Sequence, residues 1–133
     1  EERPDSDAMQ HKLRLAGRWN AGLALDDFGM GYNSEAILVD TPLQYVKLDM
    51  SIIRHIDIDQ SRLKLLQNLI SYSRERGIAV IAEGVETREE MRVLIENGVD
   101  YLQGFYLGRP SYDVYTLPET LRADIRGLAK NRL

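Results

Sequence analysis

The sequence predicts an α/β fold in which parallel strands alternate with helices. Four short apolar segments lack strict apolar–polar alternation, and each is separated from the next by a segment with helical character. Polar and charged residues collect where these strands end. Strands of this kind are typical of a parallel sheet that is buried on both faces. An open doubly wound sheet and part of a (β/α)8 barrel both fit the pattern.

The first half of the chain is expected to supply two helices and two strands. The apolar residues of segment 8–19 recur at helical spacing. A strand over residues 22–27 follows, and a glycine-containing loop then leads to a short helix that ends near Leu38. Pro42 breaks the chain before a second strand over residues 45–49.

A long helix and a fully apolar strand are expected next. Residues 61–76 have helical spacing, Ser61 can cap the start, and Gly77 lies where a left-handed residue ends a helix. The third strand covers residues 78–82.

The last part of the chain begins with a capping signal. Thr87 is followed three residues later by Glu90, which is the pattern of a capping box for a helix that ends at Gly98. Residues 99–103 form the fourth expected strand, and residues 117–130 the last helix. Because parallel strands are joined by right-handed crossovers, we expect the four strands to be parallel neighbours in chain order.

Length and composition exclude several classes of protein. The chain has 133 residues, which suits one domain but is about half of the roughly 250 residues of a full barrel. It has no cysteine, so disulfides, thiolate zinc sites and cysteine nucleophiles are excluded. The net charge of −4 argues against binding to a nucleic-acid polymer. No apolar run is long enough for a membrane span. We therefore expect a cytoplasmic segment without membrane contact, in a parent protein that can still carry a membrane anchor.

Each strand delivers polar side chains to its carboxyl end, where parallel α/β proteins place their functional residues. The residues are Asp26 and Asp27, Lys47 and Asp49, Glu83 and Glu86, and Gln103. Carboxylate oxygens suit Mg²⁺ or Mn²⁺, so this set of residues predicts a metal site. Asp26 and Asp27 can both reach one site only if the chain bends, and the turn after them permits this.

A structural explanation stays open for each of these residues alone. Asp27 can cap the next helix, and Lys47 can pair with Asp26 or Asp49. Glu83 can be a solvated loop residue. The set as a whole favours a site, because buried charges need a partner or a metal.

Four segments in chain order resemble the motifs of the EAL-domain family, which hydrolyses or senses cyclic di-GMP. The resemblance covers about residues 8–112 of a partial domain that spans residues 1–133, with a terminal helix region over 113–133. It implies the last four strand–helix units of a (β/α)8 barrel of the TIM type. The segments are residues 26–34 (DDFGMGYNS), 47–49 (KLD), 82–87 (AEGVET) and 103–110 (QGFYLGRP).

The resemblance also implies roles in a two-metal phosphodiesterase. Asp26, Asp27 and Glu83 are the expected metal ligands, and the expected cations are Mg²⁺ or Mn²⁺. Lys47 would orient or deprotonate the attacking water, with Glu83 and Gln103 as further catalytic groups. Substrate or loop support is expected from Glu86, Phe28, Gly29, Gly31 and Asp49.

Two features depart from the family pattern. Met30, Asn33 and Phe105 differ from its usual residues, although none is an expected ligand. The family's Glu-Ala-Leu strand and the other ligands of the first barrel half are absent. We therefore expect part of a cyclic di-GMP phosphodiesterase, with little activity by itself. The alternative is a non-catalytic module that senses cyclic di-GMP or binds a protein. A homodimer, or the remainder of a longer multidomain protein, is expected to complete the sheet.

Overall fold

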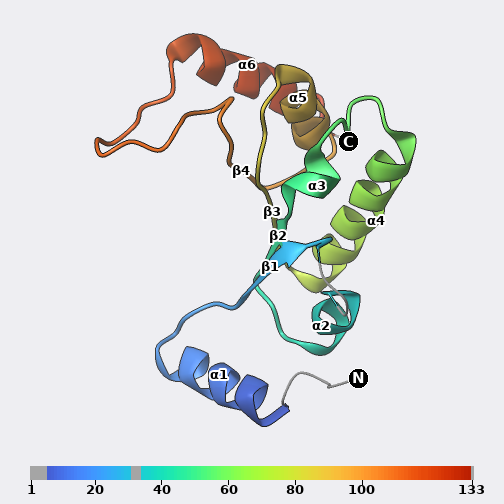
Figure 1. Ribbon diagram of the computed structural model, residues 1–133, viewed down its shortest axis with the longest axis vertical. Coiled ribbons are helices and arrows are strands. Elements are labelled where there is room, and N and C mark those ends of the chain that lie inside the picture. Colours follow the sequence, from blue (N-terminus) through green and yellow to red (C-terminus); the bar gives the residue numbers. More distant parts are fainter. Residues whose placement is uncertain (1–5, 31–33, 133) are drawn as a thin grey trace.

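The computed structural model of the chain describes residues 6–30 and 34–132 (Figure 1). Gly31, Tyr32 and Asn33 of the family's loop pattern lie outside the described residues. The elements in chain order are α1 (Ser6–Arg18), β1 (Ala24–Phe28), α2 (Ser34–Asp40), β2 (Tyr45–Leu48), α3 (Met50–Ile53), α4 (Gln60–Arg76), β3 (Ala79–Ala82), α5 (Arg88–Glu96), β4 (Tyr101–Leu102) and α6 (Glu119–Ala129).

The strands form one sheet in the order β1-β2-β3-β4, and every neighbouring pair is parallel. This confirms the predicted topology. Because all four strands run in the same direction, their carboxyl ends lie at one edge of the sheet. The residues expected at the functional site therefore share one rim of the fold.

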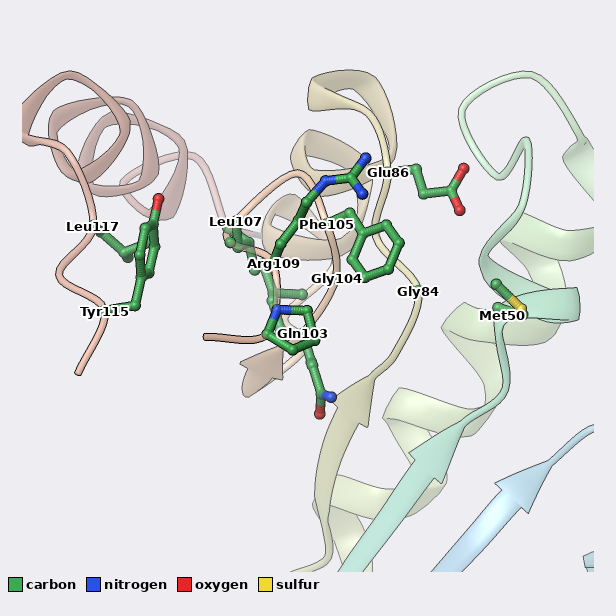
Figure 2. A pocket seen from close by; sticks show the side chains of 13 residues that line it. Met50, Gly84, Glu86, Gln103, Gly104, Phe105, Leu107, Arg109, Tyr115 and Leu117 are labelled. Carbon is green, nitrogen blue, oxygen red and sulfur yellow. The ribbon is translucent and has the colours of Figure 1, made fainter. Parts of the chain in front are cut away.

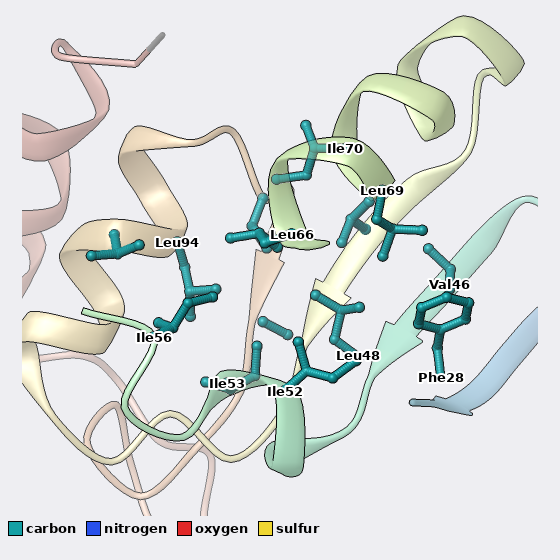
Figure 3. Close-up of a cluster of buried hydrophobic side chains, with 14 of the residues drawn as sticks. Phe28, Val46, Leu48, Ile52, Ile53, Ile56, Leu66, Leu69, Ile70 and Leu94 are labelled. Carbon is teal, nitrogen blue, oxygen red and sulfur yellow. The ribbon is translucent and has the colours of Figure 1, made fainter. Parts of the chain in front are cut away.

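One face of the sheet carries the hydrophobic core. Val46 and Leu48 of β2 are fully buried, and they lie in one apolar cluster with Leu66 and Leu69 of α4 (Figure 3). The alternating residues of β2 face the other way, and Tyr45 is 37% exposed. This second face is not buried within the chain, in contrast to the two covered faces that the sequence predicts. It corresponds to the interior of a barrel of which the chain supplies a part.

One helix and one helix cap differ from the prediction. The structure contains a short helix, α3, that the sequence pattern did not reveal. Asp49 begins it by accepting a hydrogen bond from the Ser51 amide at 2.7 Å. The side chain of Asp59, and not Ser61, caps α4, because it accepts from the amides of Ser61 and Arg62. The predicted left-handed Gly77 and the predicted capping box at Thr87 are both confirmed.

The fourth strand is shorter than predicted, since β4 holds only two residues. Before it, the Asp100 carboxylate accepts from the Val80 amide at 2.8 Å and so takes the place of a main-chain acceptor. After it, pairing continues through the Gln103 amide, which donates to the Ala82 carbonyl at 2.9 Å.

The first helix, α1, lies apart from the sheet (Figure 1). Trp19, which follows it, is 72% exposed. Among the helices of the described residues, none has the length and apolar character needed to cross a bilayer.

Candidate functional site

Three carboxylates meet at the carboxyl ends of β1 and β3. One oxygen from each of Asp26, Asp27 and Glu83 lies within 4.8 Å of the others. Lys47, near the end of β2 between them, places its ammonium 2.5 Å from Glu83 Oε1 and 3.2 Å from Asp26 Oδ1. Four of the residues predicted from the sequence therefore form one cluster.

A β-bulge brings the two aspartates to the same site. Leu25 is paired with Val46 and Phe28 with Leu48, so Asp26 and Asp27 together face the single residue Lys47. Adjacent residues of a regular strand point to opposite faces, and a bulge removes that restriction. Asp27 has φ of 52°, in the left-handed region that aspartate tolerates better than most residues. The bend therefore lies at Asp27 itself, one residue before the Phe28-Gly29 turn where the sequence placed it.

The electrostatics of the cluster centre on Lys47. Hydrogen bonds to Glu83 first, and then to Asp26, raise the pKa of Lys47 above its ordinary value of 10.5, against the opposing effect of burial. The lysine is thus an ammonium at neutral pH. It offsets part of the repulsion among the three carboxylates.

The loop after β3 is held by an ion pair. Glu86 accepts from both terminal nitrogens of Arg54, the residue that follows α3, and the longer of these contacts is 3.0 Å. This hydrogen bonding lowers the pKa of Glu86. Gly84 has φ of 75°, and a Cβ there would lie 2.5 Å from Met50 Cβ. The loop therefore packs closely against the start of α3 and positions Glu83 and Glu86.

Asp49 is a structural cap and lies outside the carboxylate cluster. Its side chain holds the start of α3, and the hydrogen bonds from Ser51 lower its pKa. Phe28 is 4% exposed and packs into the core, so it supports the end of β1 from below. Gly29 has φ of 108°, and a Cβ there would lie 2.4 Å from Ile52 Cδ1. Gly31 lies outside the described residues.

A cavity of about 550 Å³ lies beside the cluster, at the ends of β3 and β4 (Figure 2). Gln103 and Glu86 line it, together with apolar residues of the segment that follows β4. Phe105 is 55% exposed, and the Arg109 guanidinium lies 4.7 Å from the centre of its ring. A flat, partly exposed aromatic ring with a cation above it is suited to stacking with an aromatic base.

Sequence reasoning missed Arg54 and the pairing of Phe105 with Arg109. The signal for Arg54 was weak, because it directly follows a short helix, α3, that the pattern did not predict. The prediction for Glu90 was also incomplete. Its place in a capping box was predicted, but its buried contacts to a second loop were not.

This arrangement resembles known proteins. The sequence model of the EAL domain matches residues 2–110. The cyclic di-GMP phosphodiesterase PdeL of Escherichia coli is 35% identical over 91 residues, which are 68% of this chain and 25% of that protein. The cyclic di-GMP phosphodiesterase NbdA of Pseudomonas aeruginosa is 39% identical over 115 residues, 86% of this chain and 14% of that protein. The chain thus spans a quarter or less of each of these curated relatives.

Solved structures agree with the sequence comparison. A standalone EAL protein of Vibrio cholerae, bound to cyclic di-GMP, matches with a TM-score of 0.83 at 29% identity, over 92% of this chain and 52% of that one. A manganese and cyclic di-GMP complex of Klebsiella pneumoniae BlrP1 matches with a TM-score of 0.74 at 33% identity, over 78% of this chain and 26% of that one. The fold is that of a partial TIM-type barrel, and the chain belongs to the EAL domain family.

Proposed function

We propose that the chain is the carboxy-terminal half of a metal-dependent phosphodiesterase domain that hydrolyses cyclic di-GMP to the linear dinucleotide. The observation that carries the proposal is the cluster of Asp26, Asp27 and Glu83 around Lys47. The names of the relatives, and the cyclic di-GMP complexes among the matched structures, support this substrate.

The cluster fits a divalent cation. It offers only carboxylate oxygens, which are the donors that Mg²⁺ and Mn²⁺ prefer. We assign Asp26, Asp27 and Glu83 as ligands, and the manganese complex of BlrP1 supports a cation of this class. When bound, the cation would polarise a phosphoryl oxygen and lower the pKa of a bound water. It would also convert an acidic rim into a site for an anion.

The remaining side chains have positioning and proton-transfer roles. Lys47 is the group best placed to orient the attacking water, because its ammonium already contacts two of the ligands. Gln103 directly follows β4 and lines the cavity, and can donate to the water or to the substrate. Glu86, through Arg54, holds the loop that carries Glu83. Phe28 and Gly29 support the end of β1, and Asp49 supports the start of α3. Gly31 is proposed to support the loop after β1.

The cavity is proposed to receive one guanine base. Phe105 offers a ring face, and Arg109 adds a cation that can contact guanine or a phosphate. The phosphodiester that is cleaved would then lie over the carboxylates, a short distance along the same rim. Cyclic di-GMP carries its two guanine bases on a ring of alternating ribose and phosphate groups, so a base in the cavity and a phosphodiester over the carboxylates are compatible with the shape of the messenger.

The other half of the barrel is proposed to come from the remainder of a longer multidomain polypeptide or from a second copy of the chain. Tyr101 is 56% exposed and Tyr45 37%, and their rings lie 6.4 Å apart on the face that a complete barrel would enclose. The edges of β1 and β4 have no strand partner among the described residues. The exposed Trp19 and the isolated α1 also suggest a missing neighbour. The cytoplasmic location, and the lack of contact with membranes or nucleic-acid polymers, stay predictions.

The proposal is tested with the complete domain, meaning this segment joined to the first four strand–helix units of the barrel. Purified domain, cyclic di-GMP and Mg²⁺ or Mn²⁺ are incubated, and the products are separated by chromatography. We expect the linear dinucleotide to form only with the metal. Tight binding of cyclic di-GMP without any turnover would instead identify the non-catalytic sensor that the sequence left open as an alternative.

A further inference from the structure

Glu90 makes more contacts than a helix cap requires. It is the third residue of α5 and is 2% exposed. In the capping box, the Glu90 amide donates to Thr87 Oγ1 at 3.1 Å, and Glu90 Oε2 accepts from the Thr87 amide at 3.3 Å. These two bonds complete the cap. Two additional amides also donate to the same buried carboxylate.

The additional donors come from two different loops. The Glu86 amide, in the loop after β3, donates to Oε2 at 3.0 Å. The His55 amide, in the segment after β2 and α3, donates to Oε1 at 3.3 Å. His55 has φ of 59°, which turns the chain at this point. One carboxylate therefore uses one oxygen for each loop.

The two loops carry different parts of the candidate site. The loop after β3 begins at Glu83 and includes Glu86, whereas the segment that contains His55 follows Lys47 along the chain. Arg54, next to His55, is the partner of Glu86, so the carboxylate and the ion pair connect the same two segments. The titratable residues on the two segments that contact Glu90 include Arg54, His55 and Glu86.

We propose that Glu90 is a positioning residue that fixes the loop after β3 against the segment after β2, and thereby sets the distance between Glu83 and Lys47. This inference rests on the proposed metal-dependent function, since it assigns a role in that site. It requires both carboxylate oxygens to act as acceptors. A side-chain amide in place of the carboxylate would have an NH₂ group where one of the two oxygens lies, and this donor would face a main-chain N–H.

The decisive variant is therefore Glu90→Gln. The glutamine keeps the shape of the side chain and one acceptor, so it can retain the cap, but it cannot accept from both loops. The matched control is Thr87→Ala, which removes the other half of the capping box and leaves the Glu90 carboxylate in place. Both variants are made in the complete domain, and thermal unfolding is recorded for each.

The first readout is Mn²⁺ affinity, measured by electron paramagnetic resonance of the free ion. We expect Glu90→Gln to weaken Mn²⁺ binding about tenfold and Thr87→Ala to weaken it less than twofold, at similar losses of thermal stability. Equal effects of the two variants on Mn²⁺ affinity would overturn the positioning role. If the unmodified domain binds no Mn²⁺, the proposed function fails and the second readout alone decides the inference.

The second readout needs neither metal nor a variant. Amide hydrogen exchange is measured on the unmodified domain by NMR. Because one carboxylate accepts from the His55 and Glu86 amides, we expect both to be protected, with protection factors within about threefold of each other. A protection factor of the His55 amide that is a hundredfold smaller than that of the Glu86 amide would show that the two loops open independently, and would refute the link.

Discussion

Replacing Lys47 by methionine removes the only cation that contacts the carboxylate cluster within the described residues. The ammonium is 2.5 Å from Glu83, and these two side chains are 27% and 24% exposed. The contact with Asp26 is longer, 3.2 Å, and that side chain is 62% exposed, so solvent screens it more. Ion pairs of this exposure contribute up to about 1 kcal/mol each. We expect Lys47→Met to lower the free energy of unfolding by about 1.5 kcal/mol without metal, or the Tm by about 5 °C.

The assay is thermal unfolding of the complete domain in a chelator, with Lys64→Met as control. Lys64 is exposed on α4 and has no ion pair within 4 Å among the described residues, so its loss should leave the Tm unchanged. Mn²⁺ should then stabilise Lys47→Met at least as much as the unmodified domain, because the cation no longer competes with an ammonium. Identical Tm values for Lys47→Met and the unmodified domain in the chelator would refute the reasoning.

The same variant predicts a pH dependence. The folded-state pKa of Lys47 is raised above 10.5, so the ion pairs contribute fully below that value and are lost as the pH rises through the raised pKa. The difference in stability between Lys47→Met and the unmodified domain should therefore be constant from pH 7 to about pH 10. It should shrink at higher pH, and a difference that grows with pH would contradict the assignment.

Three other outcomes follow from the structure. Gly29→Ala should lower the free energy of unfolding, measured in urea, by about 2 kcal/mol or more, because φ is positive and a Cβ would contact Ile52. Gly127→Ala, in open space on α6, should raise the free energy of unfolding by up to about 1 kcal/mol. Equal effects of the two variants would contradict this. The 133-residue chain alone, incubated with cyclic di-GMP and Mn²⁺, should turn over far below 1 s⁻¹, since half of the barrel is missing; chromatography that shows turnover near 1 s⁻¹, the low end of ordinary enzymes, would oppose it. In light scattering, the chain alone should associate through its open sheet edges; a cooperatively folded monomer at every concentration would disprove this.

The sequence predicted the sheet because its signals are local. Apolar runs, Gly77 at a helix end and the capping box at Thr87 act within a few residues, and the structure retains all of them. The rule for parallel crossovers then ordered the strands without any further information. The predicted meeting of Asp26, Asp27, Lys47 and Glu83 followed from this topology, because parallel strands end at one rim.

The features that were missed depend on contacts between distant segments. The bulge at Asp27 is visible only in the register against β2, because the sequence shows two adjacent aspartates and no extra residue. The short β4 results from the Asp100 side chain, which replaces a main-chain acceptor of Val80. Arg54 pairs with Glu86 across 32 positions in the chain. No local pattern identifies such partners.

Asp26→Asn and Glu83→Gln in the complete domain test the central claim most directly. Each change preserves the size of the side chain and removes one ligand charge, with Glu75→Gln on the exposed side of α4 as the matched control. Turnover of cyclic di-GMP with Mn²⁺ and the Tm in a chelator are measured together. The account predicts a loss of turnover of about a thousandfold or more for both variants, with folding intact and the control unaffected. Turnover within a few-fold of the unmodified domain for either variant would contradict it.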